Sequence, residues 1–209
     1  MNYRHIYHAG NFADVVKHCV LTLLLQKLHE KEKAFSIIDT HAGIGIYDLQ
    51  SQQASKTNEA QEGILKLLLS SQDKSFFEHY LKVIQNQKTG FYPGSPLISR
   101  AFLRPQDRLW LSELHPEDFQ NLAQLFYKDP QVKVFHQDGY NSLKALLPPK
   151  EKRGLILIDP PFEERNEFKM LVNGLQESYR RFATGIYMIW FPIKDLKPIK
   201  EFYAALKEL

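Results

Sequence analysis

Short apolar runs alternate with amphipathic helical patterns along most of this chain. Runs that are rich in β-branched or aromatic residues predict five strands, at residues 35–39, 108–114, 132–135, 155–158 and 184–191. Strands that alternate with helices are typical of a doubly wound α/β fold with a mostly parallel sheet and helices on both faces.

The first helix is predicted between Asn11, as its N-cap, and about Glu30. Two polar residues within it, Lys17 and His18, either lie on a solvated face or border a cofactor. The apolar positions recur at helical spacing at Val16, Val20, Leu23, Leu24 and Leu28.

Residues 46–94 depart from the α/β repeat, because the next strand arrives late. Helical patterns at residues 64–69 and 76–84, joined by polar linkers, predict a small helical insertion after the first strand. The insertion is either a cap that faces the substrate or a decoration. A turn cluster follows at residues 91–96, where Ser95 is expected to cap the next helix. We therefore expect a single domain over 1–209 with an insertion at 46–94.

The composition is that of an ordinary globular protein, with 44% hydrophobic and 24% charged residues. Cys19 is the only cysteine, which excludes disulfides within the chain and cysteine-based zinc sites. No apolar run approaches the length of a membrane span, and the N-terminus lacks the apolar core of a signal peptide. We therefore expect a cytoplasmic protein that does not bind a membrane. The net charge of +3 permits a polyanionic partner without requiring one.

Three histidines near the N-terminus raise the question of a metal site. His5 and His8 lie three positions apart, and His18 follows on the first helix. No His-Glu-x-x-His pattern accompanies them, and zinc would need further ligands at a known spacing. We therefore expect no metal.

Acidic residues or glycines follow four of the predicted strands. The carboxyl ends of parallel strands meet at one edge of the sheet, where ligands of α/β folds bind. An acidic residue at the end of the second strand would accept hydrogen bonds from both ribose hydroxyls. Together these ends predict a site for a nucleoside-type cofactor, formed by Asp39 with Gly43, Glu113, Asp138 with Gly139, and Asp159.

The glycine loop after the first strand, Gly43-Ile-Gly45, is weak evidence by itself. A dinucleotide fingerprint would place a third small residue near position 48, where Asp48 stands. This departure disfavours an NAD-dependent enzyme. The pattern Asp39-x-x-x-Gly43-x-Gly45 resembles the S-adenosylmethionine loop of class I methyltransferases.

The segment Gly154–Phe162 concentrates the chemistry of the chain. Its apolar run reads as a strand buried on both faces, and the Pro-Pro pair then ends the ladder of hydrogen bonds. An exocyclic amine is a poor nucleophile, so an enzyme that alkylates it must orient its N–H groups. Asp159 can accept one N–H and the Pro160 carbonyl another, while Phe162 can stack on a base. Asp-Pro-Pro-Phe resembles the signature of amino-methyltransferases that use S-adenosylmethionine, although a short motif also occurs as an ordinary turn.

Longer blocks of sequence extend this resemblance from Tyr3 to the last helix. The chain is similar to the bacterial large-subunit ribosomal RNA adenine-N6 methyltransferase J family. The matching blocks are Tyr-Arg-His at 3–5, His-Ala-Gly-Asn at 8–11, Asp-Val-Val-Lys-His at 14–18, Asp-Thr-His-Ala-Gly at 39–43, Tyr-Pro-Gly-Ser-Pro-Leu-Ile at 92–98, Glu-Leu-His-Pro at 113–116, Arg-Gly-Leu-Ile-Leu-Ile-Asp-Pro-Pro at 153–161 and Arg-Phe-Ala-Thr-Gly-Ile-Tyr at 181–187.

The resemblance implies a Rossmann-like class I methyltransferase fold and methyl transfer from S-adenosylmethionine to N6 of a specific adenine in 23S rRNA. It implies that Asp159 is the catalytic residue and that Tyr3 contacts the RNA, beside Pro160 and Phe162. A monomer is expected. The residues implied to contact the cofactor are His18, His41, Ser95, Glu113, Asp138, Gly139 and Asp159.

Two features depart from the family pattern. The family signature usually ends in Tyr, where this chain has Phe162, so stacking is retained but a phenol contact is not. Family members also continue past the last helix into a further strand pair, whereas this chain ends at Leu209. Without that pair, the edge of the fifth strand is expected to be uncovered.

Other functions remain open at the level of the sequence. One alternative is a methyltransferase for another amine or amide, such as a protein glutamine or another RNA, although the Pro-Pro signature for amides typically begins with Asn. A second alternative is an RNA-binding protein that has lost catalysis. Binding of S-adenosylmethionine separates an NAD-dependent enzyme from the others, and methyl transfer separates an active enzyme from an RNA-binding variant.

Overall fold

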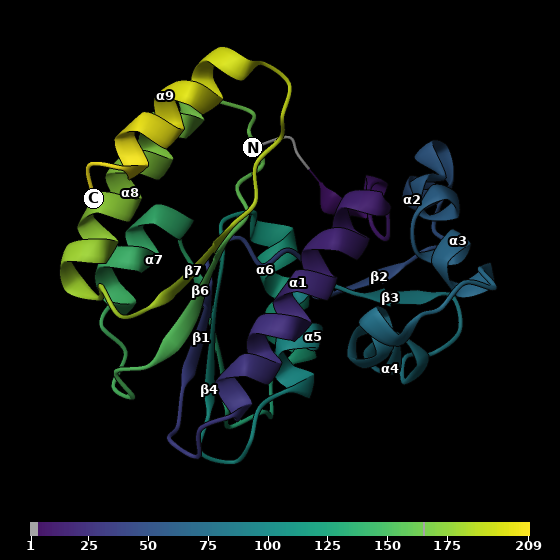
Figure 1. The fold of residues 1–209 in the computed structure, drawn as a ribbon. Coiled ribbons are helices and arrows are strands. Elements are labelled where there is room, and N and C mark those ends of the chain that lie inside the picture. The colour runs from purple at the N-terminus through teal and green to yellow at the C-terminus, as the bar shows by residue number, and fades with distance from the viewer. Residues whose placement is uncertain (1–3, 165) are drawn as a thin grey trace.

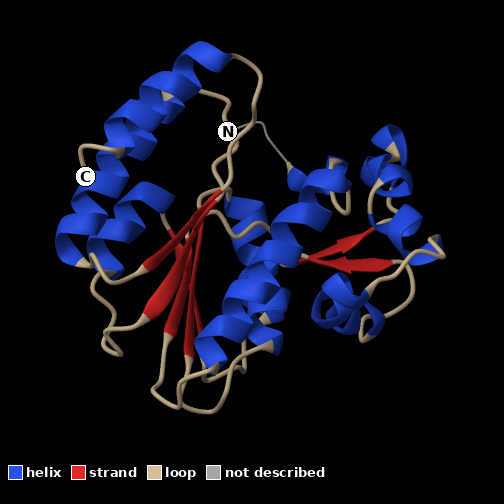
Figure 2. Ribbon diagram, viewed as in Figure 1, coloured by secondary structure: helices blue, strands red, loops and turns tan. Residues whose placement is uncertain are grey.

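A five-stranded parallel sheet forms the centre of the computed structural model, which describes residues 4–164 and 166–209 (Figure 1). The strands lie in the order β5-β4-β1-β6-β7, which confirms the predicted parallel α/β arrangement. Figure 2 shows these strands side by side, separate from a smaller two-stranded ribbon. The five strands are β1 (Ser36–Asp39), β4 (Arg108–Glu113), β5 (Val132–His136), β6 (Gly154–Ile158) and β7 (Ile186–Ile189).

Helices cover both faces of the sheet, as the sequence predicts. One face packs against α1 (Phe12–His29), α5 (Ser95–Ala101) and α6 (Pro116–Leu125). The other face packs against α7 (Gly139–Leu146), α8 (Glu167–Arg181) and α9 (Leu196–Leu206). In the part of the chain that the structure describes, no helix combines the length and the apolar character that a membrane span needs.

The apolar run of β6 is buried at all five positions because both faces of the sheet are covered. It pairs with β1 on one side and β7 on the other. Asp39 lies opposite Leu111 of β4 and Leu157 of β6, so the carboxyl ends of three strands are in register. The residues that follow these strands therefore emerge at one edge.

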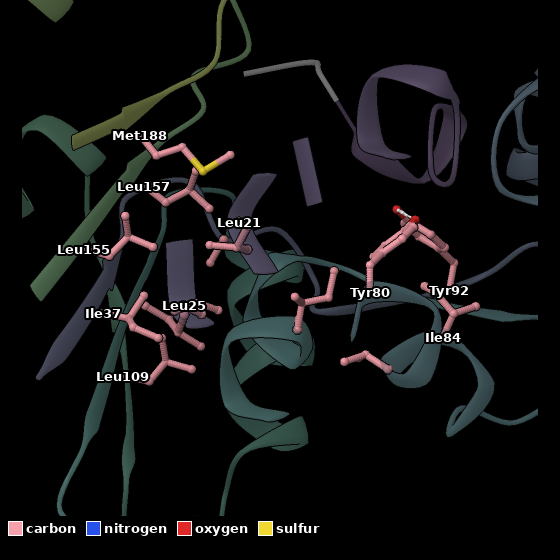
Figure 3. Packing of buried hydrophobic residues seen from close by; sticks show 14 of the residues in the cluster. Leu21, Leu25, Ile37, Tyr80, Ile84, Tyr92, Leu109, Leu155, Leu157 and Met188 are labelled. Atoms are coloured by element: carbon pink, nitrogen blue, oxygen red, sulfur yellow. Dashed lines mark hydrogen bonds between the residues drawn. The ribbon is translucent and has the colours of Figure 1, made fainter. Parts of the chain in front are cut away.

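Residues 46–94 contain the predicted helices and a short strand pair that the sequence pattern did not reveal. The strands β2 (Ile46–Asp48) and β3 (Phe91–Pro93) pair antiparallel, and three residues are too few to show a strand period. Side chains of residues 46–94 join the core of the sheet, because Tyr80 and Tyr92 belong to the same buried cluster as Leu21 and Leu155 (Figure 3). Ile64 belongs to that cluster as well. The helical elements are α2 (Gln52–Thr57), η2 (Glu59–Glu62), α3 (Ile64–Leu69), η3 (Ser75–Phe77) and α4 (Glu78–Gln85).

Helix α1 forms where the sequence predicts it, and the Asn11 side chain accepts from Asp14 N as its N-cap. Most of the apolar positions noted at helical spacing do not lie on its buried face. Val16, Val20 and Leu23 are exposed, and the helix buries another stripe that includes Leu21 and Leu25. The solvated reading of Lys17 and His18 is also wrong, because both are buried. This helix carries apolar residues on more than one side, so spacing alone could not choose the face.

Candidate active site

One cavity of about 610 Å³ lies at the carboxyl edge of the sheet. Segments far apart in the sequence form it, including η1 (His5–Tyr7), α1 and the loops that follow β1, β4, β5, β6 and β7. Tyr3 lies outside the described residues. Nine of the other predicted site residues line this cavity, namely His18, His41, Ser95, Glu113, Asp138, Gly139, Asp159, Pro160 and Phe162. Gly43 also lines it, whereas Asp39 is fully buried and does not.

The glycine loop fixes the carboxylate of Glu113. Gly43 adopts a φ of +63°, which favours glycine, and its N–H donates to Glu113 Oε2 at 2.8 Å. The N–H of His115 donates to the other oxygen at 2.7 Å. Burial raises the pKa of this carboxyl, and the backbone bonds oppose that rise. Each oxygen retains capacity for a further donor, such as a ribose hydroxyl.

Gly139 and His41 approach each other closely after β5 and β1. A Cβ on Gly139 would lie 2.4 Å from the carbonyl oxygen of Thr40 and 2.7 Å from Cε1 of His41, so no other residue fits without movement. Asp138 caps α7 through its carboxylate, which accepts from Asn141 N. Burial lowers the pKa of His41 to about 4, so this imidazole is neutral near pH 7.

Ser95 does not cap α5, as the sequence analysis expected. Gly94 occupies the N-cap position, and the Ser95 hydroxyl donates to Asp39 Oδ2 at 2.6 Å. Asp39 is fully buried, and burial raises its pKa to about 6. The N–H of His41 donates to the other oxygen of Asp39 at 3.3 Å. Ser95 therefore links the start of α5 to the end of β1.

The catalytic candidate Asp159 forms an ion pair that the sequence pattern did not reveal. Lys17 Nζ lies 2.6 Å from Asp159 Oδ2 and 3.0 Å from Asp14 Oδ1. Two neighbouring carboxylates raise the pKa of Lys17 well above its ordinary value despite burial, so the ammonium stays charged. Oδ1 of Asp159 has no hydrogen-bond partner among the described residues. The carboxylate is thus held at one oxygen and available at the other.

The Asp-Pro-Pro-Phe segment ends in an unusual backbone conformation. Phe162 has a φ of +52°, a left-handed value that is rare and costly for a residue with a side chain. Its ring packs on Phe168 with 4.9 Å between ring centroids, and it lines the cavity. Pro160 is buried, and all four residues from Asp159 to Phe162 line one side of the cavity.

These features fit S-adenosylmethionine. The cavity contains a carboxylate held by backbone N–H groups, a glycine where the backbone and His41 approach closely, and an acidic Pro-Pro segment beside them. The fold and the site define a Rossmann-like class I methyltransferase.

Comparisons with known proteins identify the family. A family model described as "Ribosomal RNA large subunit methyltransferase D, RlmJ" matches residues 32–209. This chain belongs to that family, and it is therefore an enzyme of the rRNA methyltransferase class.

Two curated relatives are both named "Ribosomal RNA large subunit methyltransferase J". The protein of Escherichia coli K12 is 47% identical over 96% of this chain and 73% of its own length. The protein of Haemophilus influenzae is 43% identical over 99% of this chain and 75% of its own length. A crystal structure of a Legionella pneumophila protein has a TM-score of 0.86 and 41% identity, covering 96% of this chain and 76% of that one.

Proposed function

We propose that this chain transfers the methyl group of S-adenosylmethionine to N6 of a specific adenine in 23S rRNA, with Asp159 as the catalytic residue. One observation carries the proposal. Residues from separate segments, each expected from the family resemblance to serve the cofactor or the amine, meet in one cavity. The names of the curated relatives support ribosomal RNA as the acceptor over a protein glutamine.

The cofactor would lie along the carboxyl edge of the sheet. Glu113 would accept from the ribose hydroxyls, since backbone N–H groups already hold it in place. Asp138 would accept from the adenine amine, and the missing side chain of Gly139 would leave room for the ring. His18, His41 and Ser95 would complete the contacts. When bound, S-adenosylmethionine supplies an electrophilic methyl group on a positively charged sulfur.

The target amine would be oriented by Asp159 and Pro160. Oδ2 of Asp159 is engaged by Lys17, so Oδ1 would accept one N–H of the amine. The Pro160 carbonyl would accept the other, and the fixed φ of proline limits its movement. Two hydrogen bonds of this kind hold the nitrogen in line with the methyl group and increase the electron density on the nitrogen. Phe162 would stack on the base, where its backbone conformation keeps the ring at the cavity wall.

The rest of the chain fits this role. Residues 46–94 share a buried core with the sheet and border the site through Tyr47 and Gly94, which supports one domain whose insertion faces the substrate. We also propose that the protein is a monomer and that it acts in the cytoplasm, where ribosomal RNA is modified. No metal takes part in the reaction as we propose it.

The test is methyl transfer from labelled S-adenosylmethionine to protein-free 23S rRNA that lacks native modifications. The RNA is digested to nucleosides, and Asp159→Ala is assayed in parallel. Label in N6-methyladenosine with the native enzyme alone is the expected result. The variant should still bind the cofactor within roughly tenfold, because it loses about one hydrogen bond. Asp159→Asn should retain some activity, since its amide oxygen can still accept from N6.

Label in another nucleoside would overturn the choice of N6, and equal label with Asp159→Ala would overturn the catalytic role. Loss of all cofactor binding in a folded Asp159→Ala protein would show that Asp159 serves mainly to bind the cofactor, and would count against its assignment as the catalytic residue.

A further inference from the structure

Three buried side chains form a hydrogen-bonded row that leads from the cavity into the insertion. His18 Nδ1 on α1 lies 2.7 Å from the hydroxyl of Tyr92 on β3. That hydroxyl lies 3.0 Å from the hydroxyl of Tyr80 on α4. Figure 3 shows the two phenol groups meeting at their oxygen atoms. None of the three residues is more than 1% exposed.

The number of hydrogens in this row fixes its direction. Burial raises the pKa of both tyrosines and lowers the pKa of His18 to about 3, so each phenol keeps its hydrogen and the imidazole is neutral. Within the described chain, Tyr92 is the only partner of the Tyr80 hydroxyl. If Tyr92 donated to Tyr80, the Tyr80 hydrogen would be buried without an acceptor. Tyr80 therefore donates to Tyr92, and Tyr92 donates to Nδ1 of His18.

A neutral imidazole that accepts at Nδ1 carries its hydrogen on Nε2. His41, on the same cavity, has the opposite arrangement. The Thr40 hydroxyl donates to the Leu157 carbonyl at 3.0 Å, so it accepts from His41 Nδ1, 2.8 Å away. Nε2 of His41 is then an acceptor. The cavity thus contains one histidine that donates and one that accepts.

Several carboxylates line this cavity and would repel the carboxylate of a ligand. A hydrogen-bond donor that is not already engaged would offset this repulsion. Two neighbouring donors are already engaged, Lys17 with Asp14 and Asp159, and Ser95 with Asp39. Nε2 of His18 has no hydrogen-bond partner among residues 4–164 and 166–209. A ligand that brings its own carboxylate into the cavity would need such a group.

We propose that Tyr92, supported by Tyr80, is a positioning residue that holds His18 as the Nε2–H tautomer, so that His18 donates to the carboxylate of the cofactor. This inference rests on the proposed use of S-adenosylmethionine, which carries that carboxylate on its amino-acid portion. The helical insertion then contributes to cofactor binding through hydrogen bonds, in addition to its place in the core.

The tautomers can be measured without any ligand, by long-range ¹H–¹⁵N spectra of the histidine side chains in the native protein. His18→Gln and His41→Gln identify the two sets of signals. The expected spectrum shows His18 protonated at Nε2 with Nδ1 as a hydrogen-bonded acceptor, and His41 protonated at Nδ1. A His18 ring that is protonated at Nδ1 would overturn the proposal.

Binding tests the consequence. Tyr92→Phe should weaken S-adenosylhomocysteine binding roughly tenfold, the effect of misplacing one hydrogen bond to a charged group. It should leave the affinity for 5′-methylthioadenosine, which lacks the carboxylate, unchanged. Tyr187→Phe is the matched control, because it removes a partly buried hydroxyl that donates to the carbonyls of Ser178 and Phe182 outside the cavity. Tyr92→Phe alone leaves the buried Tyr80 hydroxyl unpaired, which destabilises the fold. The double variant Tyr80→Phe, Tyr92→Phe removes both hydroxyls and avoids this problem.

Equal weakening of both ligands, or unchanged affinity for S-adenosylhomocysteine, would overturn the carboxylate contact. Failure of the proposed function has a different signature. In that case the native protein would bind neither ligand, while the tautomers of His18 and His41 would still be those expected.

Discussion

The ammonium group of Lys17 lies 2.6 Å from the carboxylate of Asp159, although 142 residues separate them in the chain. Lys17 is held in turn by Asp14 of the same helix, and both of these residues are buried. A charge in such a place is tolerated because its partners are fixed around it. The pair therefore joins the first helix to the end of the central strand.

Replacing Lys17 with methionine should destabilise the protein by roughly 3–5 kcal/mol, because it leaves Asp14 and Asp159 as unpaired carboxylates in or near the core. Urea unfolding measures this loss. Lys27→Met is the control, since its pair with Glu30 is exposed and should contribute at most about 1 kcal/mol. Equal effects of the two substitutions would show that burial of the Lys17 pair has no energetic importance.

Glu113→Ala should weaken cofactor binding by roughly tenfold or more and leave RNA binding unchanged, because it removes an acceptor for ribose and releases the N–H groups of Gly43 and His115. Calorimetry with S-adenosylhomocysteine measures the first effect and filter binding of RNA the second. Glu117→Gln, an exposed carboxylate on the next helix, serves as the control. An unchanged affinity would remove Glu113 from the site.

Gly139→Ala should displace the start of α7, because the new Cβ would meet the backbone oxygen of Thr40 at 2.4 Å. Overpacking of this kind costs about 1–3 kcal/mol, and the shift should also weaken cofactor binding. Thermal unfolding and calorimetry provide the measurements. Asn141→Ala lies exposed on the same helix and should change neither quantity. A stable Gly139→Ala protein with native affinity would show that the start of α7 can shift without loss of stability or of cofactor binding.

Acid should destabilise the fold between about pH 6.5 and pH 4. Burial lowers the pKa of His18 to about 3 and of His41 to about 4, so their contribution is present above the unfolded value of about 6.5 and is lost as the pH falls. Asp39 opposes them, since its pKa is raised to about 6 and its contribution is lost as the pH rises. The raised pKa of Glu113 also opposes the histidines, whereas the lowered pKa of Asp14 acts with them. The two histidine shifts together are larger than that of Asp39, so the net loss should be on the order of a few kcal/mol.

Urea unfolding at several pH values measures this slope. His18→Gln should flatten it and Asp39→Asn should steepen it. A protein that gains stability on acidification through this range would contradict the assignment of neutral, buried histidines.

The strands could be predicted because local pattern and tertiary environment agree. β6 reads as a buried run in the sequence and is buried on both faces, and Asp159 follows it as expected. The location of the cavity followed for the same reason, since the ends of parallel strands share one edge. The family resemblance added an expected role for each residue at that edge.

The remaining features depend on contacts that local sequence does not encode. Nothing near Lys17 indicates a partner as distant as Asp159, so a buried lysine looked like a solvated one. Ser95 precedes a helix in a turn cluster and has the residue type of a cap, yet Asp39 competes for its hydroxyl. The row from Tyr80 to His18 likewise requires the insertion to be folded against α1.

The place of β1 in the sheet has a consequence for the order of folding. Ser36–Asp39 is made early, but both of its neighbours, Arg108–Glu113 and Gly154–Ile158, are made much later. In a nascent chain, β1 therefore stays unpaired until β4 has been made, and its other edge stays open until β6 has been made. Pairing over such long sequence separations is slow and leaves apolar strand edges exposed in the meantime. The cavity cannot close before Asp159 is synthesised, so it forms no earlier than the pairing of β1 with β6.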